Sequence, residues 1–303
     1  MASPGFGKSA NARLPSVSIL IVDYDTERYL AKCLNSIFSA SYPRGKLQVI
    51  VVDNSPNGGA YALVKRRFPH VFAIKPGTNL GFAGGNLLAF AKATGDIIVL
   101  LNSDTIVKKD WLLQLVAPLV RDSRIAITGS KAYYPNSRKI QHAGGIINPN
   151  GLTDHIGYGL EDKGQFDKEK DVDYVTGSSL AVRRSYIERH GFLSPSYFPA
   201  YYEETEMCQG ARRNGYRVVV APQSVLYHFE SSSAAPTRTE YLRMFHKNRI
   251  KFVWRNYSLP ALLVRFIPAE VKWLLRKCPP SQRPTVLRAY VQNALEFADR
   301  WRR

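Results

Sequence analysis

The sequence predicts an α/β fold built on a mostly parallel sheet, and three observations carry this prediction. Short apolar runs alternate with helical patterns along about the first hundred residues. These runs are rich in Val, Ile and Leu at successive positions, which is typical of parallel strands buried on both faces. The chain of 303 residues is 45% hydrophobic and 22% charged, so it can bury a large core.

The first elements follow this alternation in order. A β-branched run predicts a strand at 17–22, and apolar positions at helical spacing predict a helix at 29–38. A second strand is expected at 47–52, followed by a helix at 60–68 and a short strand at 71–74. Strand, helix, strand at this spacing indicates βαβ units with right-handed crossovers.

A glycine-rich loop at 77–85 and a helix at 86–93 lead to a third long strand at 96–101. The middle section, 130–175, is rich in Gly, Asn, Asp and Lys, and it predicts a mixed region with short antiparallel strands. These elements are expected to form a Rossmann-like sheet with flanking helices.

The second half contains fewer regular patterns. Strands are expected at 172–176, 180–183 and 218–221, and a loop at 228–233. A helix is expected at 203–214, ended by Gly215 in the C′ position, where a left-handed backbone favours glycine.

Composition suggests three regions: a flexible tail at 1–15, a main domain at 16–236 and a helical extension at 237–303. The extension holds 15 Lys and Arg against 4 Asp and Glu. Apolar residues fall on one helical face in two stretches, formed by Val271, Leu274, Leu275 and Cys278, and by Leu287, Val291, Ala294, Ala298 and Trp301. Such faces suit an anionic membrane surface, or they pack on the main domain while the charges are solvated.

The whole chain is strongly basic, with a net charge of +18 and a pI near 9.9. Such a surface attracts phosphates. Three widely spaced cysteines, Cys33, Cys208 and Cys278, form no CxxC pair, so a disulfide framework or a cysteine-based zinc site is not expected. With no apolar leader and no transmembrane run, the sequence favours a cytoplasmic location, with the extension as a means of attachment to the inner membrane face.

Polar residues follow three of the predicted strands. They are Asp23 and Asp25, Asp53 and Asn54, and Asn102 and Asp104. Ligands of open α/β sheets bind beyond the carboxyl ends of the strands, so these side chains are expected to form a site. Asp and Asn also cap helices and form turns, which is the structural alternative for each residue alone.

Four segments carry a family resemblance. In chain order they read VSILIVDYDTERYLAKCLNSI, VIVVDNS, NLGFAGGNLLAFAKATGDIIVLLNSDT and VTGSSLAVRR…YYEETEMCQGARRNGY. Together they resemble the inverting glycosyltransferases of family 2, which have a GT-A fold, and in particular the rhamnosyltransferase-like members. The resemblance covers roughly residues 16–260. It implies transfer of a sugar from a nucleotide diphosphate.

The resemblance also implies a nucleotide site. Asp53 is similar to the family's acid that contacts uracil or thymine, and a carboxylate can accept from the N3–H of those bases. A dTDP- or UDP-sugar is therefore the expected donor. Glycines of the 79–86 loop would let the backbone approach the nucleotide. The nucleotide-contacting residues expected on this basis are Asp25, Asp53, Asn54, Gly81, Asn86 and Ser103.

A divalent cation, Mg²⁺ or Mn²⁺, is expected beside Asn102-Ser103-Asp104, which matches the family's metal motif. Alternate residues at a strand end share one side, and hard cations prefer oxygen ligands. Because position 102 is an amide, Asp104 is expected to contribute most. His228 lies where many relatives have a histidine in the metal or phosphate shell, and a purely structural histidine is the alternative.

The candidate base lies in an acidic cluster. Relatives read Glu-Asp-x-Asp here and use the second acid as the base, which corresponds to Glu204, with Glu203 and Glu206 as alternates. These acids also fit the first turn of a helix, where the dipole favours negative charge. Gly177 and Ser178, in the preceding motif, are expected to shape the donor-sugar or acceptor pocket.

The expected function is metal-assisted single displacement with inversion. The sugar, rhamnose or another hexose, would pass to a hydroxyl of a polysaccharide or polyprenyl-diphosphate-linked glycan. The alternatives are a nucleotidyltransferase, a non-catalytic sugar-nucleotide binder, and a polyanion binder that relies on the net charge. No helix-turn-helix, RNA-recognition or zinc pattern supports specific nucleic-acid binding.

Overall fold

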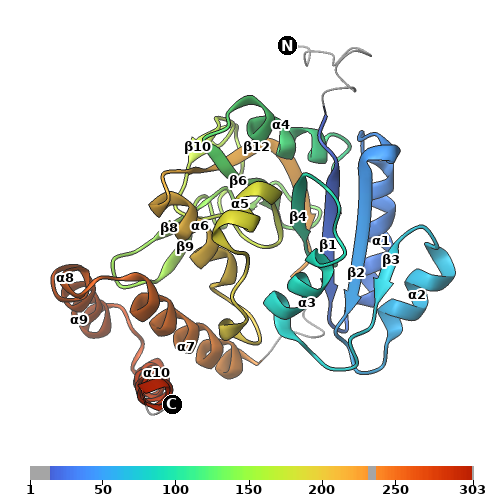
Figure 1. The fold of residues 1–303 in the computed structure, drawn as a ribbon. Helices are drawn as coiled ribbons and strands as arrows, with labels where there is room; N and C mark the ends of the chain where they lie inside the picture. Colours follow the sequence, from blue (N-terminus) through green and yellow to red (C-terminus); the bar gives the residue numbers. More distant parts are fainter. Residues whose placement is uncertain (1–13, 231–236, 302–303) are drawn as a thin grey trace.

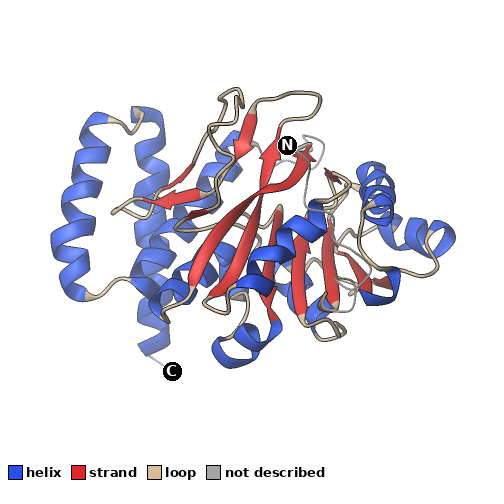
Figure 2. Cartoon of the chain, turned by 90° about the horizontal axis from the view of Figure 1, so that it is seen from above, coloured by secondary structure: helices blue, strands red, loops and turns tan. Residues whose placement is uncertain are grey.

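The computed structural model describes residues 14–230 and 237–301 (Figure 1). Within these residues a mixed ten-stranded sheet is covered by helices, as Figures 1 and 2 show. The main strand order is β10-β12-β6-β11-β4-β1-β2-β3. The predicted α/β fold is therefore confirmed. Most of the predicted tail at 1–15 lies outside the described residues, although Tyr42 donates a 2.7 Å hydrogen bond to the Pro15 carbonyl and so holds its last residue.

The parallel half of the sheet agrees with the sequence pattern. Its strands are β1 (Val17–Asp23), β2 (Leu47–Asp53), β3 (Phe72–Ile74) and β4 (Ile97–Leu101). Its first helices are α1 (Glu27–Ser39) and α2 (Gly59–Arg67), with a short 3₁₀ turn η2 (Arg44–Lys46). In the β1–β2 register Asp23 lies opposite Asp53, so two acidic side chains meet at the carboxyl edge.

Helix α3 (Gly81–Phe90) differs from the prediction of a loop at 77–85 and a helix at 86–93. Gly81 has a φ of +70°, and its N–H donates to the Asn79 side chain at 2.8 Å, so an Asx turn starts the helix early. Gly85 lies inside the helix, where an added Cβ would lie 2.8 Å from Val22. This glycine therefore allows α3 to pack closely on β1.

The second half of the sheet is mostly antiparallel. Its strands are β5 (Thr105–Val107), β6 (Ile125–Tyr133), β7 (Ile140–His142), β10 (Lys170–Asp171), β11 (Ser179–Arg183) and β12 (Arg217–His228), with β8 (Gly145–Ile147) and β9 (Thr153–His155) forming a separate pair. Short strands were expected in the middle section, and they are present.

Two strand predictions need correction. The stretch 172–176 is not a strand, because only Tyr174 makes a bridge, to Gly145. The strand expected at 218–221 runs on to His228, because a register shift after Ala221 lets β12 continue alongside β6. His228 is therefore a strand residue, paired with Thr105 of β5, and not part of the expected 228–233 loop, whose last residues lie outside the described part.

The helices of this half are α4 (Trp111–Arg121), α5 (Arg184–His190) and α6 (Glu203–Arg213), with a 3₁₀ turn η3 (Pro195–Tyr197). The α6 prediction is confirmed, and Gly215 has a φ of +80° as expected for its position. The sequence patterns did not indicate α4. Trp111 of that helix is fully buried, and its indole N–H donates to the hydroxyls of Ser130 and Ser179.

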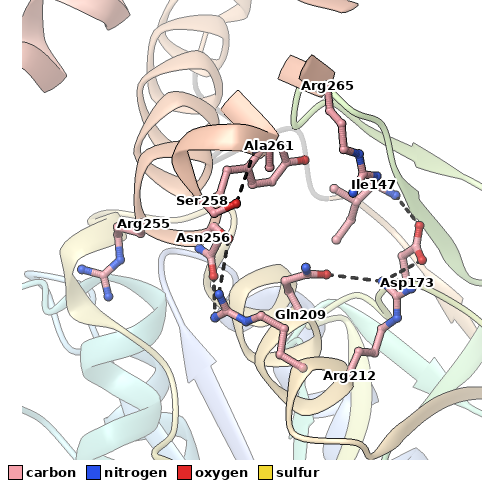
Figure 3. Close-up of a pocket in the computed structure, with 11 residues that line it drawn as sticks. Ile147, Asp173, Gln209, Arg212, Arg255, Asn256, Ser258, Ala261 and Arg265 are labelled. Carbon is pink, nitrogen blue, oxygen red and sulfur yellow. Dashed lines mark hydrogen bonds and ion pairs between the residues drawn. The ribbon is translucent and has the colours of Figure 1, made fainter. Parts of the chain in front are cut away.

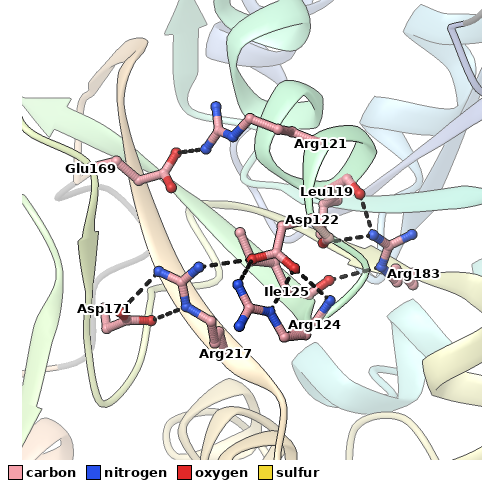
Figure 4. Close-up of polar contacts among 9 residues, drawn as sticks. All are labelled: Leu119, Arg121, Asp122, Arg124, Ile125, Glu169, Asp171, Arg183 and Arg217. Atoms are coloured by element: carbon pink, nitrogen blue, oxygen red, sulfur yellow. Dashed lines mark hydrogen bonds and ion pairs between the residues drawn. The ribbon is translucent and has the colours of Figure 1, made fainter.

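Arginines stabilise the edge of the sheet opposite the strand carboxyl ends (Figure 4). Arg183 donates to the backbone carbonyls of Leu119, Asp122 and Ile125. Arg217 forms ion pairs with Asp122 at 3.0 Å and Asp171 at 2.9 Å. These cations therefore join α4, β6, β11 and β12 to one another.

The C-terminal helices are α7 (Arg238–Asn256), α8 (Leu259–Ala261), the π-helical turn η4 (Leu262–Phe266), α9 (Ile267–Arg276), the 3₁₀ turn η5 (Pro280–Gln282) and α10 (Arg283–Trp301). Arg249 of α7 is fully buried and forms a 2.7 Å ion pair with Glu270 of α9. Glu270 also accepts from the Tyr290 hydroxyl of α10 at 2.9 Å. One carboxylate thus joins three helices.

Within the described residues, no helix combines the length and apolarity needed to cross a membrane. The three cysteines are all buried and unpaired with one another. Burial raises the pKa of both the Cys33 and Cys208 thiols to about 12, so neither forms a thiolate at neutral pH.

Candidate active site

The predicted metal residues meet at the end of β4. His228 Nε2 lies 3.2 Å from Asp104 Oδ1 and 3.2 Å from Asn102 Nδ2. The pairing of β5 with β12 makes this possible, since it brings position 228 next to the turn that follows β4. His228, which is distant in the sequence, therefore meets Asn102 and Asp104 at one point of the carboxyl edge.

Gln141 orients the histidine from the other side. His228 Nδ1 lies 2.7 Å from Gln141 Oε1, an atom that can only accept, so the proton resides on Nδ1. Nε2 then carries the lone pair, which accepts from the Asn102 amide at 3.2 Å and also faces Asp104 Oδ1 at 3.2 Å. A lone pair and a carboxylate oxygen that face each other at 3.2 Å suit a cation between them.

The residues fit a divalent cation on this evidence. Asp104 supplies a carboxylate oxygen, His228 an imidazole nitrogen and Asn102 an amide, a set that suits Mn²⁺ and is compatible with Mg²⁺. Among the described residues there is no group of three or more His, Cys, Asp or Glu that could hold a metal. Donor phosphates would have to supply the remaining ligands.

The expected pocket residues connect this point to the acidic cluster. The Ser178 carbonyl accepts a 3.2 Å hydrogen bond from the Asn102 N–H, which ties β4 to the turn before β11. The Gly177 N–H lies where it lowers the pKa of the Glu204 carboxyl. An added Cβ at Gly177 would lie 2.6 Å from the Phe82 ring, so glycine permits this close packing.

The three candidate glutamates have different surroundings. Burial raises the pKa of Glu204, a half-buried residue, and the Gly177 N–H opposes that shift. Burial also raises the pKa of Glu203, which is only 1% exposed and has no hydrogen-bond partner for either oxygen, well above its usual value. Glu206 forms a 2.8 Å ion pair with Arg255 and accepts from Tyr197. Glu206 is thus tied to α7, away from Gly177.

The residues predicted to contact the nucleotide near the end of β2 form hydrogen bonds that involve backbone N–H groups. Asp53 is 1% exposed and accepts from the N–H groups of Ser55 at 2.9 Å and Tyr61 at 2.7 Å. Asp25 has a left-handed backbone, with φ +54°, and its N–H donates to the Ser55 hydroxyl at 2.7 Å. Ser55 therefore links Asp25 and Asp53 in one turn, which brings the two predicted residues together.

Asn54, Gly81 and Asn86 form a second part of this region. Asn54 donates to the Gly81 carbonyl at 3.0 Å, and Asn86 donates to the Phe82 carbonyl at 2.9 Å. The amide oxygens of both asparagines are buried without a partner. A hydroxyl or N–H of a bound ligand would satisfy such an acceptor.

The side chain of Ser103, a predicted nucleotide residue, is held inside the protein. Ser103 is 4% exposed, and its hydroxyl lies 2.6 Å from the Thr26 hydroxyl, which donates to Asp23. Burial raises the pKa of Asp23 to about 6. The Asp23–Thr26–Ser103 chain therefore supports the site from within, and Ser103 can meet a nucleotide only through its backbone.

The sequence patterns missed the residues that hold the loop before α6. Asn248 of α7 donates to three carbonyls of that loop: those of Tyr197, Ala200 and Tyr201. Tyr201 and Tyr202 both have left-handed backbones, with φ of +82° and +81°. Consecutive left-handed residues other than glycine are strained, so this segment holds Glu203 and Glu204 in position at an energetic cost. No local signal marks Asn248 or Gln141, because both act over long sequence distances.

The fold and this site define a class of protein. A parallel half with acidic strand ends, joined to an antiparallel half that supplies a histidine and buried glutamates, is the architecture of GT-A glycosyltransferases. Residues 18–191 match the family described as Glycosyl transferase family 2, and the chain belongs to that family. The resemblance inferred from the sequence motifs is thereby confirmed.

Curated relatives are similar at low identity. An uncharacterised protein of Sinorhizobium fredii is 28% identical over 254 residues, covering 80% of this chain and 28% of that protein. The low-salt glycan biosynthesis hexosyltransferase of Haloferax volcanii is 28% identical over 70% of this chain and 66% of its own length. The chain thus spans less than two thirds of both of these relatives.

A relative of similar size is the N-acetylglucosaminyl-diphospho-decaprenol L-rhamnosyltransferase of Mycobacterium tuberculosis, 22% identical over 85% of this chain and 88% of its own length. Among solved structures, a mannosyltransferase of Pyrobaculum calidifontis in complex with GDP-mannose and Mn²⁺ aligns with a TM-score of 0.60. It is 17% identical, and the match covers 93% of this chain and 75% of that one. This likeness supports the GT-A fold.

Proposed function

We propose that the protein is an inverting glycosyltransferase that moves a hexose from a dTDP- or UDP-sugar to a glycan hydroxyl. The observation that carries the proposal is the continuous path of contacts from His228 and Asp104, through Asn102 and Ser178, to Gly177 and Glu204. It joins a candidate diphosphate site to a candidate base along one edge of the sheet.

Glu204 is the proposed base. Its oxygens take the proton of the acceptor hydroxyl as that oxygen attacks the anomeric carbon from the side opposite the nucleotide. The C1–O bond to the diphosphate breaks in the same step, so the configuration inverts. A raised pKa makes this carboxylate a stronger proton acceptor. Glu203 is a second candidate, but its nearly complete burial leaves less access for an acceptor.

Asp104, His228 and Asn102 are the residues proposed to hold Mg²⁺ or Mn²⁺. When bound, the cation supplies charge neutralisation for the leaving diphosphate. Gln141 keeps the Nε2 lone pair of His228 directed toward this point. Gly177 and Ser178 would border the donor sugar.

The nucleoside is proposed to lie over the ends of β1 and β2. Asp53 would accept from a uracil or thymine N3–H, since two backbone contacts leave some of its lone pairs free. Asn54 and Asn86 offer buried, unpartnered amide oxygens. Asp25 and Gly81 are proposed to border the same nucleotide. The proposed nucleotide is therefore UDP or dTDP.

The acceptor is proposed to be a lipid-linked or polymeric glycan, and rhamnose is the first candidate for the sugar. Both suggestions are supported by the name of the mycobacterial relative, an N-acetylglucosaminyl-diphospho-decaprenol L-rhamnosyltransferase. A cytoplasmic enzyme attached peripherally to the membrane would meet such an acceptor. The basic C-terminal helices are the proposed attachment.

The first test is a titration of the purified protein with UDP, dTDP and GDP, with and without Mn²⁺. UDP or dTDP should bind preferentially, and Asp104→Ala should weaken binding about tenfold or more, because a charged ligand is lost. Asp110→Ala, an exposed acid near the same strand, is the matched control. Binding without base preference or cation dependence would contradict the proposal and favour a polyanion binder.

A further inference from the structure

A cavity of about 610 Å³ opens between the C-terminal end of α6 and the first C-terminal helices (Figure 3). Four arginines line it, namely Arg212, Arg213, Arg255 and Arg265, and Asp173 is the one acidic residue of the lining. Among the described residues that line the cavity, none belongs to the candidate active site. The cavity is therefore a separate, positively charged space.

The arginines are held in place and still have capacity for an anion. Arg212 pairs with Asp173 at 2.7 Å, and Arg213 donates to the Asn256 side chain at 2.8 Å. Arg255 is the most constrained, because it pairs with Glu206. A guanidinium has five N–H donors, so one or two contacts leave donors for a further ligand. The Arg212 side chain is 42% exposed and can be reached from solvent.

The position of Asp173 indicates the kind of ligand. Figure 3 shows Arg212 and Arg265 directed toward Asp173 from two sides. The guanidiniums thus already converge on a carboxylate, and four positive charges in the lining exceed its single negative charge. Planar, forked guanidiniums match the geometry of phosphate oxygens. A phosphate is therefore the anion that best suits the arginine charge that Asp173 leaves unneutralised.

An exposed apolar row lies on the helical segment that forms one wall of this cavity. Ser258 and Arg265 line the cavity, and between them Leu259, Leu263 and Val264 are 68%, 55% and 74% exposed. The row continues along α9 through Ile267, Val271 and Leu275, and a second row on α10 comprises Leu287, Val291 and Leu295. Of the apolar faces predicted for the extension, Val271, Leu275, Leu287 and Val291 are exposed, whereas Cys278 is buried.

The charges around the rows are of one sign. Between residues 257 and 296 the acidic residues are Glu270 and Glu296. Glu270 is buried with Arg249, and Glu296 pairs with Lys247 and Lys251 of α7. The exposed charged residues of this stretch outside those pairs are Arg265, Lys272, Arg276, Lys277, Arg283 and Arg288. Apolar rows flanked by cations complement an anionic bilayer.

We propose that the arginine cavity binds the head-group phosphate of an anionic bilayer lipid, while the adjoining row of Leu259, Leu263 and Val264 enters the acyl region. Both features involve the segment 258–265, and this favours a lipid over a soluble phosphate, because a soluble phosphate would make no contact with the apolar row. The inference rests on the proposed membrane attachment, and it is independent of the transfer reaction.

The test uses the full chain with two kinds of vesicle, one of phosphatidylcholine and one of phosphatidylcholine with phosphatidylglycerol at three to one. The double variant Arg212→Lys/Arg265→Lys keeps the charge and removes the forked geometry. Its binding to the anionic vesicles should weaken about tenfold, the effect of one lost charged hydrogen bond. The matched control, Arg276→Lys/Arg288→Lys, changes two exposed arginines and should bind within about twofold of the wild type.

Three further results decide the matter. Equal binding by both lysine variants and the wild type would mean that surface charge alone attracts the vesicles, and it would overturn the site. Inorganic pyrophosphate binding that requires Arg212 and Arg265, without any change in vesicle binding, would overturn the lipid as the occupant. Leu263→Ser/Val264→Ser should weaken vesicle binding, and unchanged binding would contradict insertion of the row.

Thermal unfolding of each variant controls for loss of fold. Titration of the same variants with UDP and dTDP separates this inference from the proposed function. Normal nucleotide binding with lost vesicle binding would support the lipid site. Normal vesicle binding together with absent nucleotide binding would count against the transfer reaction and leave the lipid site intact.

Discussion

The two ends of α6 carry opposite chemistry on a single helix of 11 residues, about 15 Å long. Glu203 and Glu204 stand at the N-terminal end, in a buried environment. Arg212 and Arg213 stand at the C-terminal end and line an open cavity. A helix dipole favours anions at its start and cations at its end, so both ends follow the dipole.

The comparison shows that burial outweighs the dipole at the N-terminal end. The dipole alone would lower the pKa of Glu203 and Glu204, yet both pKa values are raised. Desolvation is thus the dominant influence on the proposed base. At the other end the arginines remain partly solvated, which suits exchange of a ligand with the surroundings.

The largest expected effect is at the N-terminal end. Glu204→Gln should lower kcat by about 10²–10⁴-fold, because the acceptor proton loses its base. Activity of the wild type should rise with pH through the raised pKa of Glu204, and this limb should disappear in the variant. Both are measured by steady-state turnover of a dTDP- or UDP-sugar across pH. Glu188→Gln, an exposed glutamate on α5, is the control.

Retained activity in Glu204→Gln with loss in Glu203→Gln would reassign the base by one residue. Loss of UDP binding in Glu204→Gln would instead point to a structural role for this carboxylate.

The next effect concerns the ion pair between α7 and α9, two of the C-terminal helices. Arg249→Met leaves Glu270 buried without its cation, and the free energy of unfolding should fall by about 3–5 kcal/mol. Denaturant titration followed by circular dichroism measures the change. Lys272→Met, at an exposed position of α9, should change it by less than about 0.5 kcal/mol.

The double variant Arg249→Met/Glu270→Met should recover most of this loss, because the unpaired charge is gone. If it is as unstable as the single variant, the ion pair itself stabilises the helix contact more than burial penalises it.

A smaller effect is expected outside α6, at the residues proposed to hold the cation. Gln141→Leu removes the acceptor for His228 Nδ1, so the imidazole loses its fixed tautomer. The affinity for Mn²⁺ in the presence of UDP should fall about 10–100-fold, as measured by calorimetry. Gln165→Leu, an exposed glutamine, serves as the control. Unchanged affinity would show that His228 is not a ligand.

The smallest expected effect is on the pH dependence of stability that burial of Glu203 causes. A raised pKa means that the folded state holds a proton on Glu203 which the unfolded chain has released. Stability of the wild type should therefore fall as pH rises above the ordinary glutamate value toward the raised one. Glu203→Gln should reduce this slope, leaving the part due to Glu204 and Asp23, and should add about 1 kcal/mol at pH 8. Urea unfolding at pH 5 and pH 8 would show it, and a steeper slope in the variant would refute the assignment.

Local patterns were sufficient for the parallel strands and for helix α6. The strands β1, β2 and β4 and the helix α6 have periodicities that depend on near neighbours in sequence. Helix α4 was missed because Pro118 lies inside it, and proline removes a helical hydrogen bond. Helix α3 was placed late because glycine is a poor helix former, although Gly81 and Gly85 serve close packing here.

The candidate site was predictable where a family motif exists and unpredictable where partners are distant. Asn102, Asp104 and His228 were named from the sequence, and the fold brings them within hydrogen-bond distance. Gln141 lies 87 residues from His228, and no local spacing reveals that contact. The arginine cavity likewise needs α6 and the C-terminal helices to be folded together.

The buried cysteines offer a practical advantage for studying both ends of α6. All three thiols of the sequence, Cys33, Cys208 and Cys278, are at most 3% exposed, and burial raises the pKa of each. A maleimide dye or spin label should therefore not react with the native cysteines of the folded protein. A single cysteine introduced at Lys272 would carry the label alone, and its spectrum would report how the C-terminal helices respond to a vesicle.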